Sequence, residues 1–279
     1  MSRSIAEVLK EATQILQNAG VPEARREAGS LLSFVTGKDR TFLIAHAEDE
    51  VNDVDQFREV VERRAAGEPL QYITGTQDFF GREFRVTPDV LIPRPETELL
   101  VEAALEVNKA ASLICDVGTG SGCIALTLLC ELAHARAVAL DKSPAALEVA
   151  KFNAQNLSVA DRAEFVVSDC FDSLDSREFD LIVSNPPYVS ANVLEGLQRE
   201  VRDHEPLIAL SPGPDGLSII RRLIDESPKF LRQNGHLIME IGFDQGEAVQ
   251  KLIDANVWEL LEVRPDLQCI PRIVLLRKR

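Results

Sequence analysis

The segment FDLIVSNPPY, residues 179–188, joins an apolar run to an asparagine and two prolines. The run 179–184 predicts a buried strand. Pro186 and Pro187 cannot continue that strand, because proline donates no backbone hydrogen bond. Asn185 is therefore expected at the carboxyl end of a strand, which in an open α/β sheet is the edge where ligands bind.

From residue 111 onward, strand-like apolar runs alternate with helical patterns. Such alternation is typical of an α/β fold with a mostly parallel sheet and helices on both faces. The strands of such a sheet end at one common edge. The predicted strands cover residues 113–117, 137–140, 165–167, 181–184, 236–241, 260–263 and 273–276, and the predicted helices cover 122–132, 144–156, 216–231 and 245–255.

The chain before this region has a different pattern. Apolar residues at helical spacing predict helices over 4–19, 22–35 and 54–66, with another near Leu43. This bundle carries no nucleophile, metal or phosphate signature, so we expect it to recognise a partner. We expect a helical substrate-recognition domain at 1–70, a linker at 71–95 with a hairpin about Gly81, and the α/β domain at 96–279, whose first helix covers 96–107.

Composition bounds the partners and the location. Acidic residues outnumber basic ones 45 to 30, giving a net charge of −15. Because phosphate binding needs a basic face, we expect a protein partner and no stable nucleic acid complex. No apolar run approaches the roughly 18 residues of a membrane span, and the charged helical start is unlike a signal sequence, so we expect no membrane association. Five cysteines without a C-x-x-C pair favour a cytoplasmic protein, and four scattered histidines predict no metal site.

A glycine-rich turn follows the first strand of the α/β region. It consists of Gly118, Thr119, Gly120, Ser121 and Gly122. Its G-x-G-x-G spacing, with Cys123 next, departs from the dinucleotide fingerprint G-x-G-x-x-G/A. Asp141, about twenty residues later, ends the second strand, where a carboxylate can accept ribose hydroxyls. Asp169 and Cys170 follow the third strand and could meet an adenine ring.

Together these strand ends resemble the class I S-adenosylmethionine-dependent methyltransferases, whose fold is Rossmann-like. N-P-P-Y suits methyl transfer to a planar nitrogen, which is a poor nucleophile because its lone pair is delocalised. The Asn185 side-chain oxygen and the Pro186 carbonyl can accept the two amino hydrogens, and the Tyr188 ring can pack on the planar group. The motif alone leaves open an adenine or cytosine amino group and a glutamine amide.

Over nearly its full length, the chain resembles the bacterial release factor glutamine methyltransferases, the PrmC or HemK family. This resemblance implies S-adenosyl-L-methionine as methyl donor and, as substrate, the amide nitrogen (N5) of the Gly-Gly-Gln glutamine in class 1 peptide chain release factors. An amino-methyltransferase of DNA or RNA is the alternative, and a binding protein without turnover is another. The matching segments are GEPLQYI (67–73), LIPRPETE (91–98), DVGTGSG (116–122), SNPPYV (184–189), VR (201–202) with EP (205–206), MEIG (239–242), and DLQ (266–268) with PR (271–272).

The resemblance also implies site residues. It assigns catalysis to Asn185, Pro186 and Tyr188. It assigns substrate binding to the same three residues and to Pro187. It assigns to the cofactor the turn from Gly118 to Gly122 together with Asp141, Asp169, Cys170 and Asn185. Cys170 departs from the family, where an aromatic residue is common, so Phe171 is an alternative contact for the adenine ring.

Overall fold

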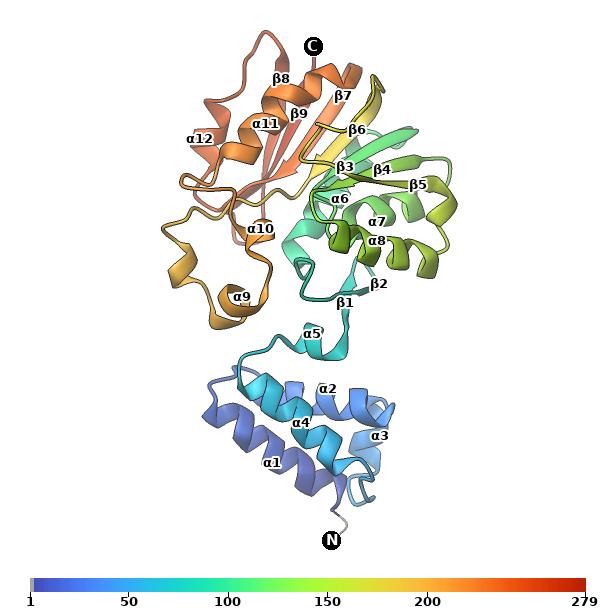
Figure 1. Ribbon diagram of the computed structural model, residues 1–279, viewed down its shortest axis with the longest axis vertical. Helices are drawn as coiled ribbons and strands as arrows, with labels where there is room; N and C mark the ends of the chain where they lie inside the picture. The colour runs from blue at the N-terminus through green and yellow to red at the C-terminus, as the bar shows by residue number, and fades with distance from the viewer. Residues whose placement is uncertain (1–2) are drawn as a thin grey trace. The chain divides into compact units, whose positions relative to one another are not determined.

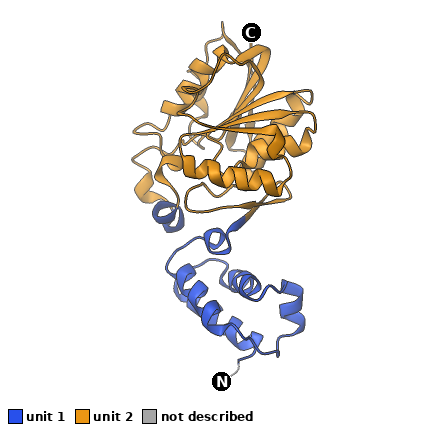
Figure 2. Ribbon diagram, turned by 45° about the vertical axis from the view of Figure 1, so that its right-hand side comes forward, with its two compact units in different colours: residues 1–76, 198–204 blue, residues 77–197, 205–279 orange. Residues whose placement is uncertain are grey.

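The computed structural model describes residues 3–279, and the chain divides into two compact units. The first contains residues 1–76 and 198–204, and the second contains 77–197 and 205–279 (Figure 2). We call them unit 1 and unit 2. Each unit has its own hydrophobic core.

Unit 1 is helical (Figure 1). Its first helix begins with a capping box, in which Ser4 and Glu7 each accept the backbone N–H of the other. The buried positions of this helix, from Ile5 to Leu16, recur at helical spacing and face the core of the unit. The helices are α1 (Ile5–Asn18), α2 (Ala24–Thr36), α3 (Arg40–Ala45), α4 (Val54–Ala65), α5 (Leu70–Thr74) and α9 (Arg199–His204).

A buried ion-pair cluster joins three of these helices. The Arg64 side chain on α4 is 3% exposed and donates to Glu27 of α2 and Glu200 of α9, each at 2.5 Å. Arg64 also donates to the Glu68 backbone carbonyl at 3.3 Å. Because α9 follows the N-P-P-Y segment in sequence, this cluster explains how a short piece from the second half of the chain packs within unit 1.

A two-stranded β-hairpin precedes the large sheet. Its strands are β1 (Thr76–Phe79) and β2 (Arg82–Arg85), as the sequence predicts about Gly81. Phe79 and Phe84 are buried against each other, edge to face, with ring centroids 6.0 Å apart. The hairpin is held to α8 (Pro144–Asn156), because Asn153 exchanges hydrogen bonds with the backbone of Arg85.

The sheet of unit 2 has seven strands among the described residues, in the order β5-β4-β3-β6-β7-β9-β8. All neighbours are parallel except β9, which runs antiparallel to β7 and β8. The strands are β3 (Leu113–Val117), β4 (Arg136–Asp141), β5 (Ala163–Val167), β6 (Phe179–Ser184), β7 (Leu231–Glu240), β8 (Trp258–Pro265) and β9 (Pro271–Lys278). The predicted α/β fold with a mostly parallel sheet is confirmed.

Helices cover both faces of this sheet (Figure 1). Alternate residues of one strand enter opposite cores: Leu181 and Val183 face one, and Ile182 faces the other. The first face is covered by α6 (Glu98–Val107), α7 (Cys123–Glu131) and α8 (Pro144–Asn156), and the second by α11 (Ser218–Glu226) and α12 (Gly246–Gln250). Shorter elements are η1 (Pro95–Thr97), η2 (Ala160–Arg162), η3 (Leu194–Gly196), η4 (Ser227–Lys229) and α10 (Leu207–Leu210).

The strand order reverses beside β3. The chain runs outward from β3 through β4 to β5 and then returns to place β6 on the other side of β3. A crevice forms at such a reversal, outside the carboxyl ends of the strands. This topology brings the glycine turn after β3 and the N-P-P-Y segment after β6 to neighbouring strand ends.

Two predicted helices end five residues early, and two predicted strands are longer than expected, β7 beginning at Leu231 instead of 236 and β8 covering Trp258–Pro265 instead of 260–263. The predicted helix 216–231 ends at Glu226, because Pro228 lies in the following 3-10 turn and Leu231 already begins β7. The predicted helix 245–255 is shorter, since α12 ends at Gln250 and the chain turns at Asp254, whose carboxylate accepts the Asn256 backbone N–H. None of the helices in residues 3–279 combines the length and the apolar character that a membrane crossing needs.

Candidate active site

A cavity of about 350 Å³ lies in unit 2 at the carboxyl ends of the sheet. Four strand ends contribute to it: residues 118–121 after β3, Asp141 of β4, residues 168–170 after β5 and residues 185–187 after β6. The extended segment before α6, the starts of α7 and α8, the chain at 208–212 and residues of α11 also line it. The structure therefore brings most of the predicted site residues together; Gly122 and Tyr188 are not among those that line the cavity.

The glycine turn is shaped by left-handed backbone. Gly118 and Gly120 have φ of +75° and +56°, and a Cβ added at either would meet no atom within 4 Å. Gly122 has a different role: its φ is +83°, and an added Cβ would lie 2.8 Å from the Leu126 side chain. Gly122 thus allows the turn to pack on α7, while Gly118 and Gly120 leave open space for a ligand.

Asp141 ties the glycine turn to the second strand. Its Oδ2 accepts the Gly120 backbone N–H, and its Oδ1 accepts the Ser143 backbone N–H, both at 2.8 Å. Burial raises the pKa of Asp141 despite these two donors, which favour the ionised form. Each carboxylate oxygen keeps a further lone pair with which it can accept a ligand hydroxyl.

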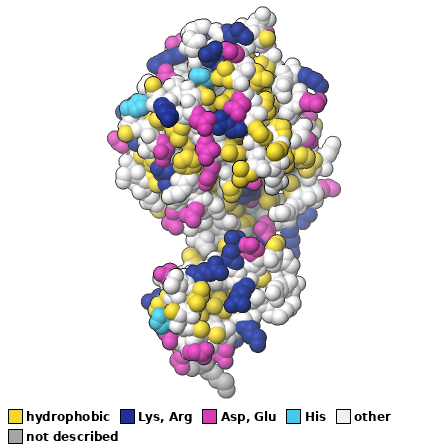
Figure 3. Space-filling model, turned by 180° about the vertical axis from the view of Figure 1, so that it is seen from behind, with side chains coloured by type: hydrophobic (Ala, Val, Ile, Leu, Met, Phe, Trp, Pro, Cys, Tyr) yellow, Lys and Arg dark blue, Asp and Glu magenta, His cyan; other side chains and the backbone are white. Residues whose placement is uncertain are grey.

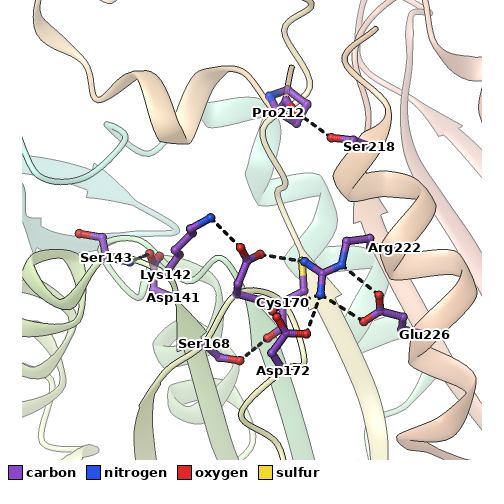
Figure 4. A network of polar contacts seen from close by, with 11 residues as sticks. Asp141, Lys142, Ser143, Ser168, Cys170, Asp172, Pro212, Ser218, Arg222 and Glu226 are labelled. Atoms are coloured by element: carbon purple, nitrogen blue, oxygen red, sulfur yellow. Dashed lines mark hydrogen bonds and ion pairs between the residues drawn. The ribbon is translucent and has the colours of Figure 1, made fainter. Parts of the chain in front are cut away.

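Asp169 lies between two cations, Lys142 and Arg222, at the cavity wall. Both cations are labelled in Figure 4. Lys142 Nζ is 2.6 Å from one carboxylate oxygen, and Arg222 Nη1 is 2.9 Å from the other. The hydrogen bond from Lys142 lowers the pKa of Asp169. Arg222 on α11 also contacts Asp172 at 2.9 Å and Glu226 at 3.0 Å. Its i, i+4 spacing to Glu226 predicts only a helix-surface pair, so sequence reasoning missed Arg222.

Cys170 and Phe171 occupy different surroundings. Cys170 lines the cavity, with a left-handed φ of +49°, and its carbonyl accepts the Ser168 hydroxyl at 2.8 Å. Burial raises the pKa of the Cys170 thiol to about 11, so the thiol is neutral at physiological pH. Phe171 is buried and stacks on Phe230 with ring centroids 5.1 Å apart. Of the two, Cys170 has the position from which a ligand can be contacted.

The N-P-P-Y segment is anchored by two residues that sequence reasoning gave no role. The Asn185 Nδ2 group donates to Thr97 Oγ1 at 3.0 Å, and Thr97 Oγ1 donates to Glu240 Oε2 at 2.7 Å. Tyr188 donates its hydroxyl to Glu240 Oε1 at 3.1 Å. Pro186 and Asn185 line the cavity, whereas Tyr188 packs beside the core of unit 2.

Arg94 and Glu205 form an ion pair beside the cavity. Arg94 Nη2 lies 2.5 Å from Glu205 Oε1, and the Glu205 side chain is 2% exposed. Arg94 lines the cavity and also donates to the Ile92 carbonyl at 3.1 Å. The segment before α6 is thereby joined to the chain that precedes α10. Among residues 3–279, no cluster of His, Cys, Asp and Glu has an arrangement that could hold a metal ion.

Comparison with known proteins gives the class that this fold and cavity define. The methyltransferase small domain family matches residues 95–200, and the PrmC N-terminal domain family matches residues 7–75. A solved methyltransferase from Pyrococcus furiosus has the same fold, with a TM-score of 0.53 over 72% of this chain and 90% of that chain, at 13% identity. The chain is a methyltransferase of class I fold.

Two curated relatives define the family. The release factor glutamine methyltransferase of Koribacter versatilis is 42% identical over 280 residues, which cover 99% of each chain. The release factor glutamine methyltransferase of Cereibacter sphaeroides is 45% identical over 274 residues, which cover 98% of each chain. The chain belongs to the release factor glutamine methyltransferase family, and the family predicted from the sequence motifs is confirmed.

Proposed function

We propose that this protein transfers a methyl group from S-adenosyl-L-methionine to the N5 amide nitrogen of the Gly-Gly-Gln glutamine in class 1 peptide chain release factors. The observation that carries the proposal is the anchored amide of Asn185 at the end of β6, beside the cavity. Membership of the family supports the same substrate.

The cavity fits S-adenosylmethionine in size and chemistry. A volume of about 350 Å³ lies within the range of small-molecule sites. The open space at Gly118 and Gly120 admits close approach of a ligand to backbone, and Asp141 offers acceptors for ribose hydroxyls. Residues 168–170 would hold the adenine. The bound cofactor would supply an electrophilic methyl group on its sulfonium.

The protein's part in the reaction is to hold and aim the amide. A glutamine amide is a weak nucleophile, because its nitrogen lone pair is delocalised into the carbonyl. Asn185 Oδ1 and the Pro186 carbonyl can accept the two amide hydrogens and so orient the nitrogen for in-line attack. Such positioning can contribute on the order of 7 kcal/mol to lowering the barrier. The alkylated amide is acidic enough to release its proton to water, so the site needs no strong base.

In this proposal, unit 1 recognises the protein substrate. A surface groove in this unit is lined by apolar residues of α1 and α3 and edged by three cations, Lys10, Arg25 and Arg40. Ile44 in this groove is 71% exposed, although it is a large aliphatic residue. We expect Ile44→Asp to raise KM for the release factor and to leave cofactor affinity unchanged. Leu261→Asp is a matched control, because Leu261 is exposed on β8 of unit 2.

The overall charge gives a further expectation. Apart from the three cations of the groove in unit 1, the acidic protein, at −15, should attract a basic surface of its substrate, so the methylation rate at low substrate should fall as salt rises to physiological strength. A space-filling view shows basic and acidic side chains interspersed on the visible face (Figure 3). A rate that is flat in salt would remove this electrostatic component from the proposal.

The test uses labelled S-adenosylmethionine with three substrates: a class 1 release factor, the same factor with its Gly-Gly-Gln glutamine changed to alanine, and nucleic acid. Label on the unchanged factor alone is the expected result. Label on the alanine factor would move the reaction to another residue, and label on nucleic acid would replace the substrate class while keeping the catalytic centre.

A further inference from the structure

Glu240 is a buried carboxylate that the proposed reaction does not use. It ends β7, and it is 2% exposed. In the parallel pairing of β6 with β7, Ser184 lies opposite Met239, so the next residues along each strand are Asn185 and Glu240. The sheet register thus places a buried acid at the level of the amide that would hold the substrate.

The hydrogen bonds around Glu240 have only one possible direction while it is ionised. A carboxylate accepts and cannot donate, so Thr97 must give its single hydroxyl hydrogen to Glu240. The Thr97 oxygen can then only accept, and it takes a hydrogen from Asn185 Nδ2 at 3.0 Å. The nitrogen end of the Asn185 amide is therefore fixed toward Thr97, and the oxygen end faces the other way.

This orientation matters because the two ends of the Asn185 amide differ in chemistry. A substrate amide NH₂ group needs an acceptor, which Asn185 supplies only if Oδ1 and not Nδ2 meets it. No hydrogen bond among the described residues occupies Asn185 Oδ1, so it stays available. Glu240 also accepts the Tyr188 hydroxyl at 3.1 Å, which holds the last residue of the N-P-P-Y segment.

We propose that ionised Glu240 is a positioning residue, which through Thr97 sets the acceptor end of Asn185 toward the substrate amide and directly holds Tyr188. The inference rests on the proposed function, since it needs a reaction in which Asn185 accepts a hydrogen from the substrate. It assigns a function to Thr97 and Glu240, which act on the substrate through Asn185 and Tyr188.

The charge state of Glu240 supplies a way to test this role. Burial raises the pKa of Glu240, against the opposing effects of the hydrogen bonds from Thr97 and Tyr188. Only the ionised form of Glu240 fixes the direction of the hydrogen bonds from Asn185 through Thr97 to Glu240. Activity should therefore be lost as pH falls through the raised pKa of Glu240. The titratable groups that act on or face Glu240 are Arg272 of β9, Glu96 of η1, Tyr188 after β6 and Cys123 of α7.

The main variant is Glu240→Gln, which keeps the size of the side chain and can donate as well as accept. We expect methyl transfer at saturating cofactor to slow by about 10- to 100-fold, the range found when outer hydrogen-bond partners of site residues are removed at metal centres. The dependence of the rate on acid pH should also disappear in this variant. Glu102→Gln is the matched control, because Glu102 is an exposed carboxylate on α6 that is not among the groups acting on Glu240. Its rate should stay within about 3-fold of that of the unchanged enzyme, since an exposed charge contributes little.

Two variants of Thr97 test whether Glu240 acts on Asn185 through the Thr97 hydroxyl. Thr97→Ser keeps the hydroxyl and should retain most activity, whereas Thr97→Val keeps the shape, loses the hydroxyl and should be as slow as Glu240→Gln. A readout without cofactor is the NMR signal of the Asn185 side-chain NH₂ group. That signal should shift as Glu240 titrates in the unchanged protein and should not shift with pH in Glu240→Gln.

The outcomes separate the two proposals. An unchanged enzyme that methylates the factor, with Glu240→Gln equally fast and equally pH-dependent, would overturn the inference alone. Thr97→Val as active as Thr97→Ser would overturn it as well. An unchanged enzyme that transfers no methyl group to the factor would overturn the proposed function, and with it the reaction that Glu240 is inferred to serve.

Discussion

The variant Asp141→Asn tests whether Asp141 binds the cofactor or only stabilises the fold. The change keeps the shape of the side chain and removes its charge at the end of β4. Burial raises the pKa of Asp141, so the ionised carboxylate is less favourable in the folded protein than in the unfolded chain. Neutralising it should therefore not destabilise the fold through the loss of charge. Removing the buried charge favours folding, but one of the two backbone donors, at Gly120 or Ser143, would lose its acceptor, and this loss offsets the gain in stability.

The expected loss is in cofactor affinity. Replacing charge-assisted hydrogen bonds to two ribose hydroxyls by neutral ones should weaken binding by about 1–3 kcal/mol, or about 5- to 150-fold in Kd. The unchanged protein should also bind S-adenosylmethionine less tightly as pH falls through the raised pKa of Asp141, because protonation removes the same charge. In Asp141→Asn this dependence on pH should be absent.

The assay is calorimetric titration of the cofactor, with thermal unfolding measured beside it. Asp161→Ala is the control, because Asp161 is exposed in the η2 turn. We predict a large change in Kd with Tm moved by only a few degrees. Unchanged Kd in Asp141→Asn would refute the assignment of the second strand end to the ribose, and a large fall in Tm with proportionate loss of binding would make Asp141 a structural residue.

Three other changes test the physical account. Burial raises the pKa of Asp116 to about 7 from an ordinary 3.8, so the free energy of unfolding should fall by up to about 4 kcal/mol as pH rises from about 4 to about 7. Asp116→Asn should lack this fall, and urea unfolding with the same pH dependence in both proteins would contradict the prediction. Glu27→Gln should cost unit 1 about 1–3 kcal/mol, because the buried Arg64 guanidinium loses one of its two carboxylate partners and keeps Glu200, while Glu23→Gln, in an exposed pair, should change stability by less than about 0.5 kcal/mol in chemical denaturation. Arg222→Gln should raise the cofactor Kd a few fold, because Asp169 and the loop after β5 lose a partly buried cation worth about 1 kcal/mol, and equal Kd values would exclude Arg222 from shaping the cavity.

Local chemistry explains what the sequence predicted well. Two prolines after an apolar run can only end a strand, so Asn185 was expected at the sheet edge where the structure has it. The left-handed backbone at Gly118 and Gly120 follows in the same way from the spacing of glycines after a strand. These features depend on a few adjacent residues, and tertiary packing does not change them.

The partners of those residues could not be predicted, because they are distant in sequence. Thr97 and Glu240 are 143 residues apart, and neither has a pattern that distinguishes it from an ordinary helix-start threonine or strand-end acid. Arg222 reaches Asp169 across 53 residues, and its local spacing to Glu226 explains it equally well without a site. The family motifs marked the segments around Thr97 and Glu240, but only the fold shows what their side chains contact.

Short elements were missed for a related reason. Helices of four to six residues, such as α9 and α10, are marginal on propensity and exist because tertiary contacts hold them. Glu200 of α9 is held by Arg64 of unit 1, a pairing that no local pattern announces.

The central claim is that Asn185 aims a glutamine amide at a methyl donor. It is tested most directly by the single-turnover rate of methyl transfer to a release factor in Asn185→Ala, at saturating cofactor and with folding checked by thermal unfolding. We predict a fall of at least about a hundredfold, in line with losing one preorganised hydrogen-bond partner at a reacting centre. A rate within tenfold of the unchanged enzyme would contradict the account.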